Sequence, residues 1–370
     1  MTEPAVPSDP AAPIARNLVV CLDGTGNEVD AKDSTNVFKF VEILDLSEAA
    51  QQLVYYDPGV GTFAAPAAWT PLEQKFSRLE GLALGHGLRQ NLGEAYTWLM
   101  QTWQPGDVVY IFGFSRGAYT ARALCGMLYR IGLLRPGSEN LVPYAVKLYA
   151  RKPGRDGNLK NAKGWDRMDR FAAGLSRPIT GDSLAFPVHF LGIFDTVKAT
   201  RVLGRDFHWP YTNQLPNVAT VRHALSIDEK RRPYQPGLVP IDPSGKRSVT
   251  ETWFAGVHTD VGGGFGDTPQ LGKITMRWMV DGAVAAGLRV RKRRVDARYS
   301  LTAADALSDV HKMGALWALA LYKHRSIPPG AHVHASVRDR IAQKSAYSRA
   351  FDKRKQGDVV WDDASWPAPQ

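Results

Sequence analysis

Short apolar runs alternate along the chain with longer segments in which apolar residues recur at helical spacing. Five runs rich in β-branched and aromatic residues predict strands: residues 17–23, 51–57, 108–114, 188–195 and 248–258. Residues 37–44 and 82–103 predict helices, the second with an apolar residue at every third or fourth position over most of its length. Such alternation implies right-handed crossovers. The predicted fold class is therefore α/β, a mostly parallel sheet with helices on both faces.

Two stretches interrupt this alternation. Residues 135–186 hold helical segments on either side of a polar loop, which is typical of a helical cap inserted between strands. Residues 305–324 predict one further helix. We therefore expect a flexible N-terminal tail over residues 1–15, a single domain over residues 16–345 that includes the insertion, and a C-terminal tail over residues 346–370.

The composition is that of a folded protein. Hydrophobic residues make up 44% of the 370 positions and ten residues are tryptophan, which excludes a disordered chain. Cys21 and Cys125 lie in apolar runs, so two buried thiols are expected rather than a disulfide. There is no secretory signal pattern, and no run approaches the roughly 18 apolar residues of a spanning helix. We expect a protein that is cytoplasmic as synthesised, with signal-less export left open.

Positive charge is concentrated in one segment. The formal net charge is +10, and residues 289–298 (RVRKRRVDAR) carry six basic side chains. This segment is either a solvated loop or edge strand, or a patch that contacts an anionic membrane or another anionic partner. The sequence shows no recognisable nucleic-acid-binding module, so no specific nucleic acid is expected as a partner.

Residues 113–117 (GFSRG) join the third predicted strand to a helix-forming run. In this context G-x-S-x-G is typical of a sharp turn that lifts a nucleophilic serine, here Ser115, above the end of a sheet. The glycines allow the strand and the helix to approach closely, and the backbone N–H of Arg116 then points toward the position of an oxyanion. The alternative is that Ser115 only caps the helix. A nucleophilic serine also needs a base, and the base needs an orienting group.

Later strand ends supply these two groups. His258 ends a predicted strand and precedes a glycine-rich loop, which suits a general base. His189, inside a strand, and His223, in a segment interpreted as helical, are expected to be structural, with His223 also a candidate to line the site. Asp195 ends the preceding predicted strand at the same edge of the sheet and is the predicted orienting acid.

Two other carboxylates compete for the role of the acid. Asp260 follows the predicted base by two residues and alternatively pins the glycine-rich loop. Asp228, in the sequence SIDEKRR, alternatively forms a helix-end ion pair with Arg231 and Arg232. Both stay candidates for supporting the site.

The end of the first predicted strand, LDGTGN, offers further groups. The backbone N–H groups of Gly24 and Thr25 would complete an oxyanion hole, as the loop after an early strand does in such hydrolases. Asp23 followed by Gly-Thr also resembles the nucleophile of aspartate phosphatases, but those enzymes need a second carboxylate where this chain has Thr25. The sequence contains no motif with metal-ligand spacing, so neither a metal nor another cofactor is expected.

Taken together, several segments resemble one known family. They are LDGTGN, GFSRGAYTAR, FLGIFDTV, VRHALSIDE and WFAGVHTDVGGGF, and residues 325–340 (RSIPPGAHVHASVRDR) also resemble the closing segment of that family. The family is the catalytic domain of the type VI secretion phospholipase effectors. The resemblance implies an α/β-hydrolase fold and the cleavage of acyl chains from glycerophospholipids. It also implies a catalytic triad of Ser115, Asp195 and His258.

The chain departs from the family at two positions. Gly26 stands where tryptophan is common and Lys198 where glycine is common, and both departures bear on the acyl pocket. We also expect the chain to be without the long membrane-binding region of the larger effectors.

The expected function is a serine hydrolase of the phospholipase, lipase or esterase type that cleaves acyl esters through an acyl-enzyme. Its substrate would be an acyl ester or phospholipid, and an immunity or carrier protein is left open as a partner. The alternatives are a housekeeping esterase of the same fold, and an inert hydrolase-fold module that binds an anionic partner or membrane surface.

Overall fold

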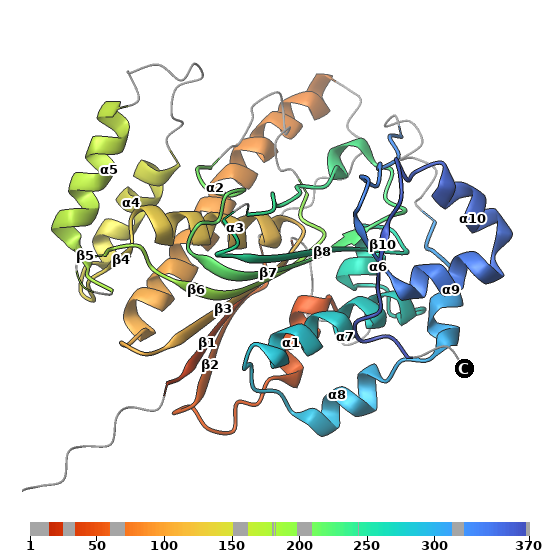
Figure 1. The fold of residues 1–370 in the computed structure, drawn as a ribbon. Coiled ribbons are helices and arrows are strands. Elements are labelled where there is room, and N and C mark those ends of the chain that lie inside the picture. Colours follow the sequence, from red (N-terminus) through yellow and green to blue (C-terminus); the bar gives the residue numbers. More distant parts are fainter. Residues whose placement is uncertain are drawn as a thin grey trace, which may run out of the picture.

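The computed structural model describes residues 15–24, 34–59, 71–150, 162–179, 181, 183–197, 209–242, 244–312 and 322–367. At its centre is an eight-stranded sheet in the order β10-β9-β8-β7-β6-β3-β1-β2, in which every neighbouring pair is parallel (Figure 1). The strands are β1 (Asn17–Leu22), β2 (Gln52–Asp57), β3 (Val108–Phe114), β6 (Val188–Phe194), β7 (Val218–Ser226), β8 (Ser248–Phe254), β9 (His332–His334) and β10 (Val360–Asp362). The carboxyl ends of all these strands therefore meet at one edge of the sheet, the carboxyl edge.

Helices cover both faces of the sheet, and an apolar core lies beneath each layer (Figure 1). One layer consists of α2 (Pro71–Thr102), α3 (Arg116–Arg130), α4 (Val142–Tyr149) and α5 (Ala162–Leu175). The other consists of α1 (Asn36–Ile43), α6 (His258–Gly262), α7 (Gln270–Ala285), α8 (Lys292–Tyr299), α9 (Ala335–Gln343) and α10 (Ser345–Asp352). This arrangement confirms the predicted α/β class. Among the described residues, no helix has both the length and the apolar character needed to cross a bilayer.

The central strands are buried on both faces, which explains their uninterrupted apolar sequences. Every residue of β1 is buried. Leu18, Val20 and Leu22 point into the core under α2 and α3, whereas Val19 and Cys21 point into the opposite core. This alternation is the two-residue period of a strand, and the apolar character of both sets is required because helices cover both faces.

Some sequence predictions are wrong. Residues around His223, interpreted as helical, form β7 between β6 and β8. The residues predicted as a C-terminal tail fold into α10 and β10, with Phe351 buried and Asp362 accepting a hydrogen bond from Nε1 of Trp278 (3.0 Å). Of the predicted helix over residues 305–324, residues 305–307 lie in a short 3-10 helix (Ala303–Leu307), and residues 313–321 lie outside the described residues. Residues 1–14 of the predicted N-terminal tail also lie outside them.

Residues 135–186, the predicted cap, contribute α4, α5 and β5 (Ser176–Arg177), which pairs antiparallel with β4 (Leu133–Leu134). Helix α4 packs on α2, and Val142, Ala145 and Tyr149 join the core of that layer. The described part of the insertion thus extends the layer formed by α2 and α3 (Figure 1). Residues 151–161 lie outside the described residues. A role as a mobile lid stays a prediction.

One of the two interpretations of the basic segment 289–298 is a loop or edge strand, but most of the segment forms α8. All six of its basic side chains are exposed. Nε2 of Gln52, the first residue of β2, donates to the carbonyl of Arg289 (2.8 Å). The segment therefore begins at the amino edge of the sheet, opposite to the carboxyl edge.

Candidate active site

Ser115 lies on the turn between β3 and α3. Its φ of 56° and ψ of −117° are strained for a residue with a side chain. The N–H of Ser115 donates to the carbonyl of Phe194 at the end of β6 (3.1 Å), which holds the turn against the next strand. A Cβ atom at Gly117 would lie 2.1 Å from the carbonyl oxygen of Leu22, so only glycine lets α3 begin this close to β1. The structure thus forms the strand-to-helix turn that GFSRG predicts.

A serine, an imidazole and a carboxylate are hydrogen-bonded in series at the carboxyl edge. Nε2 of His258 lies 2.8 Å from Oγ of Ser115, and Nδ1 of His258 lies 2.6 Å from Oδ2 of Asp195. The three residues follow β3, β8 and β6, which lie close together in the sheet. Their exposed fractions are 9% for Ser115, 4% for His258 and 0% for Asp195, so bulk water hardly competes for these bonds. We call these three residues the Ser–His–Asp array.

Asp195 is held by donors on both of its oxygens. Oδ1 accepts the N–H of Ser226 (2.9 Å) and Nη1 of Arg325 (2.5 Å). Oδ2 accepts from His258, from Oγ of Ser226 (3.2 Å) and from Nη2 of Arg325 (3.0 Å). Burial alone would raise the pKa of Asp195, but the charge of Arg325 and the hydrogen bond from His258 outweigh burial and hold that pKa well below its usual range. Asp195 is therefore ionised at neutral pH.

His258 is enclosed by two aromatic rings, that of Phe114 at 4.6 Å and that of Tyr234 at 4.9 Å between ring centres. Burial lowers the pKa of His258, and the hydrogen bond and charge of Asp195 oppose this only in part. A neutral imidazole that donates from Nδ1 to Asp195 carries its lone pair on Nε2. That lone pair faces Ser115, which is the state needed to accept a hydroxyl proton.

Glu229 is a buried carboxylate that sequence reasoning missed. It accepts the backbone N–H of His258 (3.2 Å) and pairs with Nε (2.9 Å) and Nη2 (2.7 Å) of Arg231. Burial alone would raise the pKa of Glu229, but the hydrogen bond and charge of Arg231 outweigh it and lower that pKa. The guanidinium of Arg231 in turn lies 3.7 Å over the ring of Tyr234. This pair fixes the start of α6, and the only signal in the sequence was its place in SIDEKRR.

The backbone N–H groups of Arg116 and Gly24, two of the predicted oxyanion donors, differ in whether they already donate a hydrogen bond. The N–H of Arg116, the first residue of α3, makes no hydrogen bond within the described part of the chain. Gly24 lies beside the serine, since a Cβ at Gly24 would be 3.6 Å from Cβ of Ser115. However, the N–H of Gly24 donates to Oδ1 of Asp23 (2.7 Å), so the expectation that it is available is wrong for this state. Thr25 lies outside the described residues.

The carboxylate of Asp23 is held by hydrogen bonds from neighbouring groups. Its Oδ2 accepts from Oγ1 of Thr35 (2.5 Å) and from the hydroxyl of Tyr56 (3.0 Å), so neither of its oxygens lacks a donor. This does not favour the aspartate-nucleophile alternative.

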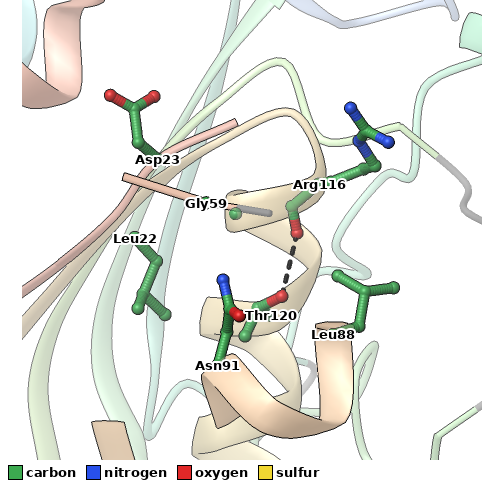
Figure 2. A pocket seen from close by; sticks show the side chains of 8 residues that line it. Leu22, Asp23, Gly59, Leu88, Asn91, Arg116 and Thr120 are labelled. Atoms are coloured by element: carbon green, nitrogen blue, oxygen red, sulfur yellow. Dashed lines mark hydrogen bonds between the residues drawn. The ribbon is translucent and has the colours of Figure 1, made fainter. Parts of the chain in front are cut away.

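Asp23 also lines a small cavity beside the turn, between the end of β1 and helices α2 and α3 (Figure 2). Its volume of about 10 Å³ holds one water molecule at most, so it cannot be an acyl-chain pocket. The carbonyl of Arg116 accepts from the hydroxyl of Thr120 (3.1 Å) at this cavity. The guanidinium of Arg116 points away from Thr120 and Asn91 (Figure 2).

Asp260 supports the start of α6, the helix on which His258 lies. Its Oδ2 accepts the N–H of Val257 (2.8 Å), and its Oδ1 lies 2.5 Å from Nδ1 of His311. Burial raises the pKa of Asp260 despite these contacts. Asp260 is therefore not part of the Ser–His–Asp array.

Asp228 also lies outside the array. It accepts the N–H of Gly256 (2.7 Å) and pairs with Arg354. The predicted pairing with Arg231 and Arg232 is wrong, because Arg231 bonds to the neighbouring carboxylate instead.

The two histidines expected to be structural have different surroundings. His223 is buried, its Nε2 accepts the N–H of Thr196 (3.1 Å), and its Nδ1 lies 2.7 Å from Glu251. His223 thus braces the residue after Asp195 and does not line the site. His189 is exposed on β6, and its Nε2 lies 2.9 Å from the carbonyl of Ala286.

Cys21 and Cys125 are free and buried, as expected. Where the structure describes side chains, no group of three or more His, Cys, Asp or Glu is placed to hold a metal ion.

A serine on a strained strand-to-helix turn, backed by a buried imidazole and a carboxylate at nearby ends of parallel strands, is the arrangement of the α/β-hydrolase class. Within that class, the chain belongs to the family described as the T6SS phospholipase effector Tle1-like catalytic domain, whose model matches residues 16–282. The chain thus carries the catalytic domain of a phospholipase-type hydrolase.

Three individual proteins that resemble this chain are 33% identical to it or less. The uncharacterized protein YEL023C of Saccharomyces cerevisiae is 33% identical over 221 residues, which are 58% of this chain and 31% of that protein, so the chain spans less than a third of its length. A solved structure of an uncharacterized protein from Pseudomonas aeruginosa has a TM-score of 0.44 at 19% identity, covering 83% of this chain and 52% of that one. The Tle1 effector bound to the VgrG spike of the type 6 secretion system has a TM-score of 0.32 at 17% identity, covering 72% and 56%.

Proposed function

We propose that the protein hydrolyses the acyl esters of phospholipids through an acyl-enzyme, with Ser115 as nucleophile, His258 as general base and Asp195 as the orienting acid. The observation that carries this proposal is the continuous hydrogen-bonded path from Oγ of Ser115 through His258 to Asp195, with distances of 2.8 and 2.6 Å. Membership of a phospholipase effector family supports a phospholipid substrate.

In the first step, Oγ of Ser115 attacks the ester carbonyl carbon and its proton passes to Nε2 of His258. The carbonyl oxygen becomes an oxyanion, to which the N–H of Arg116 donates at the positive end of the α3 dipole. Asp195 stabilises the imidazolium. When the ester C–O bond breaks, His258 returns the proton to the leaving oxygen, and the alcohol product departs as a lysophospholipid.

The second step reverses these roles with water. His258 removes a proton from a water molecule, whose oxygen attacks the acyl carbon bound to Ser115. The bond from the acyl carbon to Oγ then breaks, the proton returns to Oγ, and a fatty acid leaves. Bonds and protons balance with water as the only co-substrate.

A second oxyanion donor would come from the loop after β1. Gly24 is adjacent to Ser115, but its N–H binds Asp23 in this state. In our proposal, substrate binding exchanges that acceptor for the oxyanion, and the N–H of Thr25 joins it.

The first test is the turnover of p-nitrophenyl butyrate, a soluble neutral ester. Ser115→Ala is expected to lose at least about 10³-fold in kcat, because the nucleophile is removed while the fold is kept. Ser300→Ala is a matched control, since this serine is exposed at the end of α8 and its hydroxyl donates to the carbonyl of Asp296 rather than to the array. Activity of Ser115→Ala within tenfold of the wild type rules the mechanism out.

The second test addresses which bond is cut. A mixed phospholipid extract is incubated with the wild-type protein and the products are identified by mass spectrometry. Free fatty acid and lysophospholipid are expected from acyl-ester cleavage. Diacylglycerol or phosphatidic acid would show cleavage of a phosphodiester bond and would contradict the proposal.

Contact with an anionic membrane through residues 289–298 is a separate part of the proposal. Arg293 and Arg294 are exposed in a segment that begins at the amino edge, whereas Ser115 lies at the carboxyl edge. Reversing both charges to glutamate is expected to abolish binding to anionic vesicles without changing the turnover of p-nitrophenyl butyrate. Unchanged vesicle binding would discard this contact.

A further inference from the structure

The carboxylate of the array is paired with an arginine that lies beyond the residues matched by the family model. The family model ends at residue 282, whereas Arg325 belongs to the segment from residue 322 to 367 that forms β9, α9, α10 and β10. The side chains of Arg325 and Asp195 are both 0% exposed. A segment that extends the sheet therefore also delivers a buried cation to the candidate site.

The ion pair between Arg325 and Asp195 is bidentate, and other groups of the protein also hold the guanidinium. Nη1 of Arg325 lies 2.5 Å from Oδ1 of Asp195 and Nη2 lies 3.0 Å from Oδ2, in the fork geometry that only a guanidinium provides. Nη1 also donates to the carbonyl (3.0 Å) and the hydroxyl (2.7 Å) of Ser226, and Nη2 donates to the carbonyl of Tyr234. These bonds hold the guanidinium in place, and its two contacts with Asp195 fix the orientation of the carboxylate plane.

Every carboxylate described next to His258 has a basic partner. The three pairs are Asp195 with Arg325, Glu229 with Arg231, and Asp260 with His311. The other polar groups that face this region are the hydroxyl of Ser115, the ring of Tyr234, and the guanidinium of Arg116, which interacts electrostatically with Tyr234. The charges of Asp195 and Glu229 are thus each countered by a guanidinium, and the stabilisation of the imidazolium of His258 by Asp195 is offset by Arg325.

We propose that Arg325 is a positioning residue for the hydrolysis assigned above, an inference that rests on that proposed function. Its fork orients Asp195 so that Oδ2 is presented to Nδ1 of His258. Its charge offsets that of Asp195, so His258 remains neutral and able to act as a base in mildly acidic solution.

The test compares kcat and KM for p-nitrophenyl butyrate from pH 4.5 to 8.5 in the wild type, Arg325→Met and Arg325→Lys. Removal of the cation in Arg325→Met is expected to raise the midpoint of the acid limb of kcat/KM by about one pH unit. Its kcat on the plateau falls and KM changes little, because the orientation of Asp195 is lost. Arg325→Lys keeps the charge without the fork, so its kcat falls while the midpoint stays near that of the wild type. An unchanged midpoint in folded Arg325→Met overturns the inference.

Arg340→Met is the matched control. Arg340 is buried in the same segment but donates to the carbonyls of Ala306 (2.7 Å) and Ser308 (2.6 Å), not to the array. Its substitution removes a buried guanidinium and is expected to leave the midpoint unchanged. A shift equal to that of Arg325→Met would assign the effect to general loosening of the segment and overturn the inference.

A measurement on the wild type covers the case in which Arg325→Met does not fold. The rate at which a fluorophosphonate probe labels the protein is recorded against pH. The inference predicts a midpoint below about 6.5, the ordinary pKa of histidine. A midpoint above that value overturns the inference alone, whereas a wild type that neither labels nor hydrolyses esters overturns the proposed function itself.

Discussion

Replacing Asp195 by asparagine exchanges one of two buried acceptor oxygens for an amide nitrogen, which can only donate. At the position of Oδ1 this nitrogen would face two fixed donors, the N–H of Ser226 and Nη1 of Arg325. At the position of Oδ2 it would face Nη2 of Arg325, Nδ1 of His258 and the hydroxyl of Ser226, which can rotate to accept. The second arrangement is the less costly, because His258 can move its proton from Nδ1 to Nε2. That change points an N–H at Ser115 and removes the base.

The expected losses of folding stability and of kcat in Asp195→Asn can each be given a size. Asp195→Asn leaves the guanidinium of Arg325, which is 0% exposed, without a counter-charge. Loss of one partner from a buried ion pair costs about 3–5 kcal/mol of the free energy of unfolding. The wrong tautomer lowers kcat by about 10⁴-fold in Ser–His–Asp enzymes of other folds, and a loss of that order is expected here.

The assay combines urea unfolding followed by circular dichroism with the turnover of p-nitrophenyl butyrate. Asp228→Asn is the matched control, since Asp228 is a buried carboxylate paired with Arg354 but makes no contact with the array. This control is expected to lose a similar free energy of unfolding and to keep kcat within tenfold of the wild type. The reasoning is refuted if Asp195→Asn is folded and its kcat is as little affected as that of the control.

Two further predictions concern stability. Burial lowers the pKa of His334 to about 4, below the unfolded value of about 6.5. The unfolded chain therefore binds this proton first, and His334 removes up to about 1.4 kcal/mol of stability per unit as pH falls from about 6.5 to 4. Urea unfolding at several pH values should show a flatter acid dependence for His334→Gln, and parallel curves would contradict this. A Cβ at Gly117 would lie 2.1 Å from the carbonyl oxygen of Leu22, whereas one at Gly174 in α5 has no atom within 4 Å. Gly117→Ala should thus lose about 3 kcal/mol or fail to fold, and Gly174→Ala should stay within about 1 kcal/mol of the wild type in the same assay.

The central strands could be predicted because strands covered on both faces have continuous apolar sequences. Strand β7 could not, since Arg222 and His223 give its sequence the polar positions of a surface helix. Their partners come from other elements. The guanidinium of Arg222 lies 3.8 Å over the ring of Trp278, and His223 binds Glu251. Nothing within residues 218–226 indicates that these two side chains find such partners in other elements.

The three members of the array were predictable for a geometric reason. Ser115, Asp195 and His258 each follow a strand with a strong apolar pattern, and parallel strands end at one edge. Glu229 and Arg325 follow no such rule. Their positions depend on partners 29 and 130 positions away, and the sequence around Arg325 resembled a family segment without indicating a role for it.

The most direct test of the Ser–His–Asp assignment is to label the folded protein with a fluorophosphonate probe and to map the adduct by peptide mass spectrometry. The mechanism predicts one adduct, on the peptide that contains Ser115, in the wild type. Labelling should be lost in Ser115→Ala and strongly slowed in His258→Ala. An adduct on another residue, or a folded wild type that does not react, would contradict the account.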